Sequence, residues 1–386
     1  MADQVADVVV VGAGVIGSTL ARELQLLGAS VLLVDAGKPG FGTSGATFAW
    51  FNASAKIRLR YPDPYFELNK TAVARCYRLA NALRDGTWLH PIGNIEVATR
   101  EETANQLRAD VSEMLRRGYP AYLLDPKSIR EIEPALPLPS ESVAAFYPEE
   151  GWIDGPQLVH SAIQELRAKG GRVIEGDGVV RFKVAGGRVA EARLKSGATV
   201  EADCFVIAAG IDTMKLAALA GVHVPLLEPN SPQVAGLLVR CDWEGSADRL
   251  HRIVHFDGLA VRPDRHLQVL VAGTNDAAEV TVDTAPETLS RIADGLLHTA
   301  RRSVPCLSAA RVSSAFRGLR AIPIDRLPVV GWTPAVDNVY IVVTHSGITL
   351  AAYFAELGAS EITSRAAEAI LEPYRPGRFP MSTRSS

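Results

Sequence analysis

The stretch Asp7–Asp35 constrains the fold of this chain more than any other part of the sequence. It begins with the β-branched run Val8–Val11, which is long enough for a buried parallel strand. Apolar residues at helical spacing over Val15–Leu27 predict a helix, and Val31–Val34 predicts a second buried strand. This order of strand, helix and strand is typical of an α/β fold with a parallel sheet.

Three glycines separate the first strand from the helix. Gly12, Gly14 and Gly17 form the pattern G-x-G-x-x-G. The first glycine permits a tight turn, the second lets the backbone approach a pyrophosphate, and the third lets helix and strand pack closely. Asp35 follows about 20 residues later, where an acid binds the adenosine ribose and repels a 2′-phosphate. The motif therefore predicts a dinucleotide other than NADP and leaves FAD and NAD open.

The loop after the second strand, residues 36–47, is rich in glycine and hydroxyl side chains. Such a loop lies near the cofactor in a dinucleotide fold, where its N–H and O–H groups can meet phosphate or ring edges. The alternative is a flexible connector. The next segment, Phe48–Ala53, is too apolar for a surface loop, so we expect it to line a pocket or the core.

Composition limits the classes of protein that fit. The length of 386 residues suggests two domains. A hydrophobic content of 47% and a net charge of −3, without a basic run, predict a soluble protein with no nucleic-acid partner. The four cysteines are far apart, so neither a metal site nor a disulfide framework is expected, which favours a reducing compartment. With no signal peptide and no run of about 18 apolar residues to span a membrane, we expect a cytoplasmic protein.

The middle of the chain changes from helical spacing to alternation. Helices are expected over Asp63–Arg84, Glu101–Arg117 and Gln157–Ala168. Residues 172–206 then predict a strand, a three-stranded meander and a return strand, with glycine turns between them. Further strand candidates and one helix predict a mixed antiparallel sheet in a second domain; they lie at residues 233–240, 252–256, 259–261, 267–271, 286–302 (the helix) and 312–319.

A second strand–glycine turn–helix unit stands near the end of the chain. The apolar strand Asn338–Val343 runs into Thr344–Thr349, and a helix is expected through about Ile362. The N-terminus of that helix points free N–H groups at an electron-rich partner. Beyond Pro373 the chain is polar, and we expect residues 373–386 to form a flexible tail.

Six motifs in order resemble the D-amino-acid oxidase family, which includes glycine oxidases, sarcosine oxidases and related amine dehydrogenases. They are GAGVIG with Asp35, GTSGA at residues 42–46, GWID at 151–154, VIAAG at 206–210, GLRAIPIDRLPVVG at 318–331 and VTHSGITLA at 343–351. The resemblance implies a Rossmann-like FAD-binding domain, a parallel sheet with a β-meander, made of residues 1–85, 150–218 and 318–372. It also implies an α+β substrate domain with a mixed antiparallel sheet, made of residues 86–149 and 219–317.

The resemblance also implies FAD as the cofactor, bound in an extended conformation. Val179 would hold the adenine through its backbone, and Gly347–Thr349 would face the flavin pyrimidine edge. A helix N-terminus there stabilises the negative charge of the reduced flavin. The residues carried over as cofactor-binding are Gly12, Gly14, Val15, Ile16, Gly17, Asp35, Ala36, Thr43, Ser44, Val179, Ala209, Gly210, Ser346, Gly347, Ile348 and Thr349.

Two residues are the catalytic candidates. Arg320 matches the family arginine that clamps a substrate carboxylate, a task suited to its planar, permanently charged fork. His345 is expected to be a flavin neighbour rather than a general base. The implied reaction oxidises an amino acid or secondary amine by hydride transfer to flavin N5, giving an imine that hydrolyses. The alternative is a flavoprotein that oxidises a hydroxy acid or tailors a natural-product intermediate.

The sequence departs from some family members. No cysteine or histidine stands where covalent-flavin members attach FAD, so the flavin is expected to be noncovalent. Sarcosine oxidases carry a lysine on the strand equivalent to residues 267–271, where this chain has Gln268. Oxygen and an electron carrier therefore both remain open as acceptors, as does the oligomeric state.

The substrate-pocket candidates are the least specific part of the prediction. Glycine oxidases carry a pocket tyrosine near the position of Leu259, so a leucine there suggests an apolar or bulkier substrate. Aromatic residues and strand histidines are more often structural than ligand-binding. The candidates are Trp50, Asn52, His255, Asp257 and Leu259, and no metal site is expected.

Overall fold

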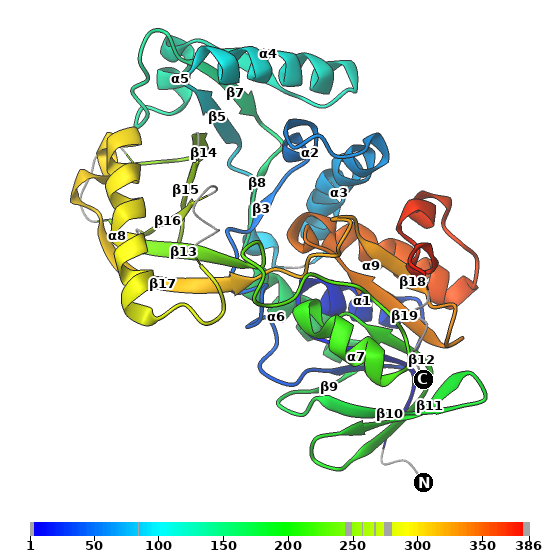
Figure 1. Ribbon diagram of the computed structural model, residues 1–386. Helices are drawn as coiled ribbons and strands as arrows, with labels where there is room; N and C mark the ends of the chain where they lie inside the picture. Colours follow the sequence, from blue (N-terminus) through cyan, green and yellow to red (C-terminus); the bar gives the residue numbers. More distant parts are fainter. Residues whose placement is uncertain are drawn as a thin grey trace.

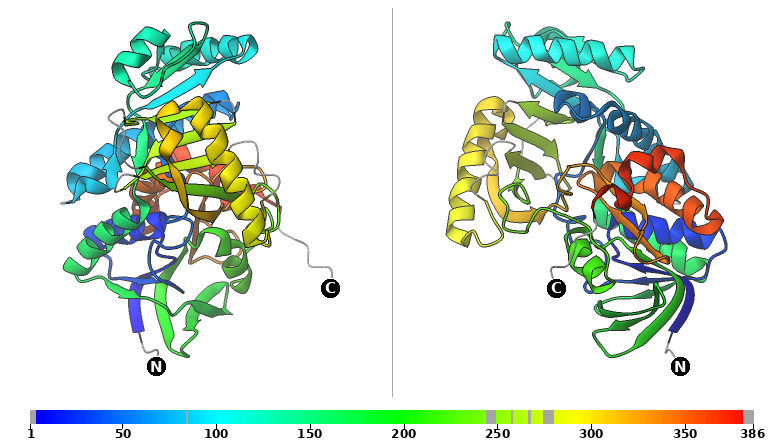
Figure 2. Two further views of the ribbon diagram at one scale, coloured as in Figure 1. Left: turned by 90° about the vertical axis from the view of Figure 1, so that its left-hand side faces the viewer. Right: turned by 45° about the vertical axis from the view of Figure 1, so that its right-hand side comes forward.

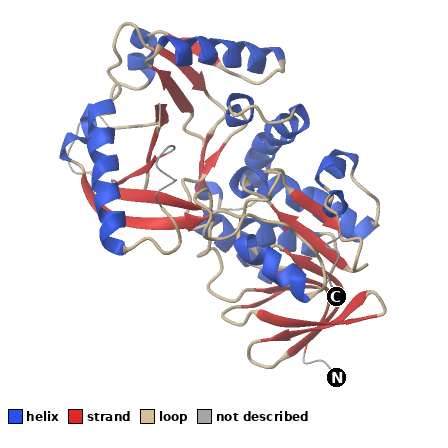
Figure 3. Cartoon of the chain, viewed as in Figure 1, coloured by secondary structure: helices blue, strands red, loops and turns tan. Residues whose placement is uncertain are grey.

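The framework of the protein consists of two eight-stranded sheets and a small three-stranded sheet (Figure 1). The computed structural model describes residues 4–83, 85–243, 249–256, 258–265, 268–273 and 280–380. One large sheet is mainly parallel and the other mainly antiparallel, with helices packed on both (Figure 3). The predicted α/β fold class is confirmed.

The first sheet has the strand order β10-β11-β12-β1-β2-β9; β19 pairs with the last three residues of β12, Phe205–Ile207, and β18 pairs with β19. Strands β9, β2, β1, β12 and β19 run parallel to one another. Both β2 and β19 are buried along their whole length, as in parallel sheets covered on both faces. The bounds are β1 Gln4–Val11, β2 Val31–Val34, β9 Arg172–Ile174, β10 Val179–Ala185, β11 Arg188–Leu194, β12 Thr199–Ile207, β18 Val329–Trp332 and β19 Val339–Val343.

Alternate residues of β1 belong to different cores. Val8 and Val10 lie in the core on the helical face, whereas Val9 and Val11 lie in the core beneath the meander and α7 (Thr213–Leu219). This alternation follows from the period of two in a strand. The β-branched run thus joins both layers of the first domain.

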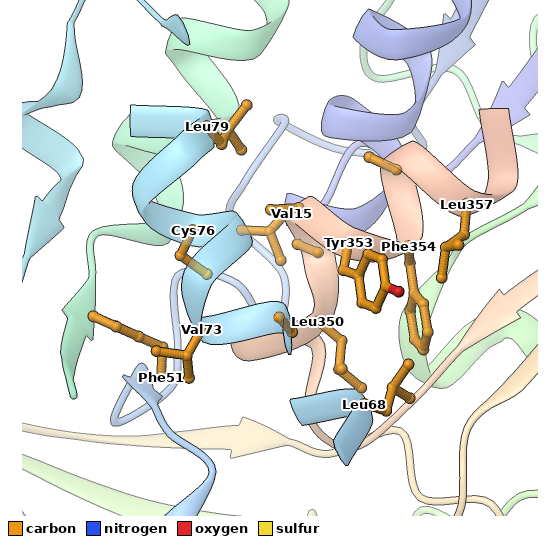
Figure 4. Packing of buried hydrophobic residues seen from close by; sticks show 14 of the residues in the cluster. Val15, Phe51, Leu68, Val73, Cys76, Leu79, Leu350, Tyr353, Phe354 and Leu357 are labelled. Carbon is orange, nitrogen blue, oxygen red and sulfur yellow. The ribbon is translucent and has the colours of Figure 1, made fainter. Parts of the chain in front are cut away.

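Four helices form the layer on the other face of the parallel sheet: α1 Val15–Leu26, α3 Asp63–Ala82, α6 Gly155–Ala168 and α9 Gly347–Ser364. Helix α1 packs on both α6 and α9, and α3 packs on the far side of α9. Figure 4 shows Val15, Leu68, Leu350 and Phe354 meeting in this layer. Because α9 is covered by neighbours on most sides, twelve of its 18 residues are buried.

The second sheet has the order β17-β13-β16-β15-β14-β5-β7-β6. It is mixed, because β14 pairs with β5 in parallel while its other strand pairs are antiparallel. Helix α8 covers it on the side away from the first sheet (Figure 2). The bounds are β5 Asn94–Ala98, α4 Glu101–Arg116, β6 Tyr122–Leu124, α5 Pro126–Ile132, β7 Val143–Tyr147, β13 Ala235–Asp242, β14 Ile253–Phe256, β15 Leu259–Pro263, β16 Gln268–Gly273, α8 Pro286–Ser303 and β17 Arg311–Leu319.

The small sheet has the strand order β3-β8-β4, and from it the chain continues toward the second sheet and α2 (Figure 1). Its strands are β3 Trp50–Phe51, β4 Leu89–His90 and β8 Gly151–Ile153, and the short helix α2 (Ser54–Arg58) follows β3. Phe51 and Ala53 are fully buried. The expectation that the apolar segment 48–53 belongs to the interior is confirmed.

The expected flexible tail is wrong for residues 373–380. Tyr374 is 1% exposed and its ring lies 6.1 Å from that of Tyr65, while the Arg375 guanidinium pairs with the buried carboxylate of Glu361 at 2.5 Å. A buried acid requires such a partner, so the segment is held in place. Residues 381–386 lie outside the described residues.

The division into two domains stays a proposal, and strand membership supports it. All strands of the first sheet fall within residues 1–85, 150–218 and 318–372, and those of the second sheet fall within 86–149 and 219–317, apart from the last two residues of β17. In the described part of the chain no helix is both long and apolar enough to cross a membrane.

Candidate functional site

The first glycine turn leaves no room for side chains. Gly12 has a φ of +105°, and a Cβ built on it would stand 2.5 Å from the Ala208 carbonyl oxygen. A Cβ on Gly17 would overlap the carbonyl of Gly12. Helix α1 begins directly after Gly14, whose position as N-cap supplies no side-chain acceptor. The turn is therefore a backbone cradle with free N–H groups at a helix N-terminus.

Asp35 lies beside this cradle. Its Oδ2 accepts a hydrogen bond from the Ala13 N–H at 2.6 Å, and its Oδ1 accepts one from the Gly37 N–H at 2.8 Å. Two backbone hydrogen bonds hold the chain around it: the Asp35 N–H donates to the Ile174 carbonyl, and the Asp177 N–H donates to the Asp35 carbonyl. These bonds bring Ala36 and the start of β10, where Val179 stands, next to one another, since a Cβ on Gly178 would touch Ala36.

The glycine- and hydroxyl-rich loop is held by hydrogen bonds to α1 and to the end of β17. Ser44 Oγ accepts from the Val15 N–H at 3.0 Å, so the hydroxyl covers part of the α1 N-terminus. Thr43 Oγ1 donates to the Leu319 carbonyl at 2.5 Å, at the end of β17. The alternative of a flexible connector does not fit these contacts.

The turn at Ala209 and Gly210 follows the parallel strand β12. Ala208 donates its N–H to the Val11 carbonyl at 2.9 Å, and Gly210 has a φ of +56°. Ala209 therefore lies beside Gly12 on the same edge of the sheet, as the motif VIAAG predicted.

The last glycine turn meets the first one. A Cβ on Gly347 would lie 3.4 Å from the side chain of Ile16, in the first turn of α1. Thr19 of α1 also donates to the Ala351 carbonyl of α9, at 3.3 Å. The N-cap residue of α9, Ser346, makes no side-chain cap, and its hydroxyl accepts from the Tyr65 hydroxyl at 2.9 Å. Two helix N-termini from opposite ends of the chain therefore converge.

Asn52 joins this second turn to β3. Its backbone N–H donates to Thr349 Oγ1 at 3.2 Å, and its side-chain amide donates to the Trp50 carbonyl at 3.3 Å. The amide oxygen Oδ1 is buried and has no hydrogen-bond partner. Leaving a buried acceptor unpaired costs about 1–3 kcal/mol of folding free energy. A ligand that donates a hydrogen bond to this oxygen would remove that cost.

Arg320 directly follows β17. Its guanidinium occupies the space over Gly236, where any side chain would overlap it, and Nη1 donates to the Gln233 carbonyl at 3.2 Å. Among the described residues no carboxylate pairs with it. Burial lowers the pKa of Arg320 from its usual value. The fork is thus held on one side and open for an anion.

His345 lies between the charged groups of the site. Its pKa is lowered to about 3, first by burial and then by the positive charges of Arg320, Lys56 and Arg326. Its side chain nevertheless keeps a substantial exposed surface. With this pKa the His345 imidazole is neutral near pH 7.

The substrate-pocket candidates separate in the structure. Trp50 donates from Nε1 to Glu150 at 3.0 Å and its ring lies 4.2 Å from that of His255. His255 is 3% exposed and bonded through Nδ1 to Asn94 at 2.8 Å, and burial lowers its pKa well below the usual value. It is a satisfied strand histidine, the more common case. Asp257 lies outside the described residues.

Leu259 corrects the pocket prediction. It is 2% exposed and packs in the core of the second sheet rather than lining a hollow. Its strand β15 turns this residue toward the apolar cluster, and a one-residue shift would have turned it to the other face. Matching Leu259 to the position of the pocket tyrosine in glycine oxidases does not predict which face of the sheet its side chain points to.

Sequence reasoning missed two buried charged residues near the site. Glu150 is fully buried, and its two oxygens accept five hydrogen bonds: from Trp50 Nε1 (3.0 Å), Ala53 N–H (3.2 Å), Ser54 N–H (3.0 Å), Asn94 Nδ2 (3.1 Å) and Tyr119 OH (2.9 Å). Lys56 of α2 is 6% exposed, and burial lowers its pKa to about 8 although Glu150 opposes that change. A lysine inside the apolar run FNASAKI was the available signal.

Comparison with known proteins places this geometry in a family. Residues 7–361 match the family described as FAD dependent oxidoreductase (DAO). The chain belongs to this family. The oxidoreductase is 26% identical to a glycine oxidase of Geobacillus kaustophilus (strain HTA426) over 357 residues, which is 89% of each chain. It is 23% identical to one subunit of the opine oxidase of Agrobacterium tumefaciens (strain Ach5), over 97% of each chain.

A solved structure shares the fold. The crystal structure of glycine oxidase from Geobacillus kaustophilus superposes with a TM-score of 0.82 at 24% identity, and covers 98% of this oxidoreductase and 100% of that chain. The two converging turns suit the cofactor of the family. The side-chain-free cradle at Gly12 leaves room for a diphosphate, and the unpartnered Asn52 oxygen can accept a hydrogen bond from a bound group.

Among the described residues no three His, Cys, Asp or Glu side chains gather as a metal site requires. A separate hollow of about 230 Å³ lies between the 38–41 loop and α6, with Lys38, Phe41 and Arg167 in its wall. Neither Arg320 nor His345 lines it.

Proposed function

We propose that this FAD-dependent oxidoreductase oxidises an amine or amino acid that carries a carboxylate, and that it binds FAD without a covalent bond. One observation carries the proposal: the open guanidinium fork of Arg320 and the neutral His345 lie together beside the Ser346–Thr349 turn. The relatives named glycine oxidase and opine oxidase support it.

The cofactor is held by backbone groups in this proposal. The cradle Gly12–Gly17, with Val15 and Ile16, binds the diphosphate, and Asp35 and Ala36 bind the ribose. The backbone of Val179 binds the adenine, and Thr43, Ser44, Ala209 and Gly210 border the diphosphate. The N–H groups of Gly347, Ile348 and Thr349 face the flavin pyrimidine edge, where a helix N-terminus favours negative charge. FAD held by these residues would supply the hydride acceptor for oxidation at the carbon that bears the amine.

The protein supplies orientation and charge placement. Arg320 binds the substrate carboxylate with two parallel bonds, which fixes the carbon beside the amine relative to the turn at Ser346. His345 is too weak a base to take a proton near neutral pH, because its pKa lies at about 3. The amine therefore enters neutral, having lost its proton to water, and His345 accepts a hydrogen bond from it.

The test is anaerobic reduction of the purified yellow protein by a panel of amino acids, N-methyl amines and 2-hydroxy acids. Bleaching of the flavin absorbance by amines and not by hydroxy acids supports the proposal, and the reverse result overturns it. Admission of air, with a peroxide assay, then distinguishes oxygen from an electron carrier as the acceptor. Arg320→Ala is expected to raise the apparent KM for a carboxylate substrate by about 100-fold, the effect of losing a bidentate charged pair.

Noncovalent attachment is tested by acid precipitation. Cys76, Cys204 and Cys241 are buried, and burial raises the pKa of each thiol to about 12, whereas Cys306 is half-buried. Such buried thiols are inert. All flavin is therefore expected in the supernatant, and a yellow pellet contradicts this part of the proposal.

A further inference from the structure

More positive charge faces His345 than one substrate carboxylate neutralises. Arg320 and Arg326 are attached to the same residue, because Arg320 Nη1 donates to the Gln233 carbonyl (3.2 Å) and Arg326 Nη2 donates to the Gln233 amide oxygen (3.4 Å). The φ of Arg326 is +64°, a conformation that non-glycine residues rarely adopt, and it is held by a bond from its N–H to Pro323 (2.8 Å). The turn and Gln233 together hold the two guanidiniums near one another.

Lys56 supplies a third cation, from helix α2. Its Nζ lies 5.9 Å from the ring centre of Tyr61 and 5.6 Å from that of Tyr65. The hydroxyl of Tyr65 bonds to Ser346, the residue after His345. The charge of Arg326 also acts on Tyr61, where it opposes the rise in pKa that burial causes.

No acid in the described part of the chain balances these three groups at contact distance. Their nitrogens take part in no ion pair, and Asp325, next to Arg326, is paired with Arg378 at 2.8 Å. Glu150 is the nearest negative charge to Lys56, but its oxygens already accept five hydrogen bonds. A buried lysine without a partner is rare, because removing its charge from water is costly.

We propose that the substrate carries two acidic groups, one bound by Arg320 and the second by Lys56 with Arg326. The substrate class is then a dicarboxylic amine: an acidic amino acid or an N-carboxyalkyl amino acid. This inference rests on the proposed function and narrows it. The N-terminus of α9 already serves the electron-rich edge of the cofactor in that proposal, so Lys56 and Arg326 are left for the substrate.

The experiment compares matched amines on the FAD-loaded enzyme under anaerobic conditions. Iminodiacetate is compared with sarcosine, and N-(2-carboxyethyl)glycine with N-propylglycine, so that each pair differs in one carboxylate. The dicarboxylate is expected to reduce the flavin with a kcat/KM about 10- to 100-fold higher, the range of one charge-assisted hydrogen bond. Lys56→Met and Arg326→Gln are each expected to bring this ratio to within about threefold of unity.

Two controls keep the comparison matched. Lys215→Met on α7 and Arg108→Gln on α4 remove exposed charges from helices outside the site, and they are expected to keep the wild-type ratio. Flavin content and circular dichroism identify a variant that fails to fold. Since Arg326 is exposed, its variant decides the question if Lys56→Met loses the cofactor.

A second readout needs no turnover. Glutarate and butyrate, which cannot be oxidised as amines, are titrated while the flavin spectrum is followed. Glutarate is expected to bind about 10-fold more tightly, and Lys56→Met is expected to remove most of that preference. The inference is overturned if the preference for the dicarboxylate over the monocarboxylate is the same in wild type and both variants, or if the enzyme prefers the monocarboxylates. If no amine reduces the flavin, the proposed function fails, and the titration still decides whether a second anion site exists.

Discussion

The two converging turns are built from opposite materials. The first, at Gly12–Gly17, consists of backbone N–H groups and glycines packed against Ala208, and the Asp35 carboxylate accepts a hydrogen bond from its Ala13 N–H. The second, at Thr344–Thr349, lies among Lys56, Arg320 and the unpartnered oxygen of Asn52. The first turn is satisfied by local geometry, whereas the second holds buried charge and an unfilled hydrogen-bond acceptor.

This difference shows which part of the molecule contains groups that destabilise the fold but can bind a ligand. A turn made of glycine and backbone is consistent with the strand and helix that flank it. Buried cations and unpaired acceptors oppose folding and persist at sites where a ligand completes them. The substrate end of the enzyme is therefore the part where substitutions should change stability and activity in opposite directions.

The largest expected effect is at the first turn. Gly12→Ala should remove most of the bound FAD, because the new Cβ meets the Ala208 carbonyl at 2.5 Å in addition to the strain of a φ of +105°. Gly28→Ala is the matched control, since Gly28 also has a positive φ (+94°) but nothing lies within 4 Å of its Cβ. Flavin absorbance per polypeptide measures the difference. Equal flavin contents in the two variants would show that the overlap plays no part.

The next effect concerns the buried acid that supports the substrate end. Glu150→Gln should lower the free energy of unfolding by about 3–5 kcal/mol, because an amide cannot accept from five donors and Lys56 loses its nearest negative charge. Urea denaturation measures it. Glu149→Gln, a substitution at the exposed neighbouring residue, is expected to change the same quantity by less than about 0.5 kcal/mol.

A stabilising effect is expected from Lys56→Met. The pKa of Lys56 is lowered from 10.5 to about 8 by burial, so the charged form is disfavoured in the folded state. The wild type is therefore penalised below pH 8 and recovers as the pH rises toward 10.5, where the unfolded chain also loses the proton. The variant should be more stable at pH 7 by on the order of 3 kcal/mol, with a smaller gain at pH 10. A variant less stable than wild type at pH 7 would contradict the assignment of a disfavoured buried charge.

The smallest effect concerns the pH dependence of His345. Since its pKa lies at about 3, the imidazole is neutral at every pH where the enzyme is assayed. His345→Gln should lower the rate of flavin reduction without changing the shape of the kcat/KM profile between about pH 5.5 and 7.5, where an ordinary histidine titrates. If the kcat/KM profile of the wild type changes near pH 6.5 and that of the variant does not, His345 has a proton-transfer role.

The sequence by itself determined most strands of the first sheet and the helices beside it, because the information that specifies them is local. The residues Val8–Val11, the glycines at 12 and 17 and the strand Val31–Val34 specify adjacent elements through spacing of a few residues, and the structure has them at nearly the predicted bounds. The same holds for the final strand–turn–helix unit, whereas the predicted third meander strand and return strand are one continuous strand, β12. Periodicity and turn chemistry carry these predictions.

Only the tertiary structure decided the substrate end. Lys56, Glu150, Gln233, Arg320 and His345 come from five segments, and the burial of Lys56 and Glu150 and the surroundings of the other three depend on packing that no local pattern encodes. For the same reason Leu259 turned toward the core, and the segment around Tyr374, polar in sequence, was held by Glu361 through Arg375. The electrostatic energy of a charge is set by its distances to all other groups, and these exist only once the chain is folded.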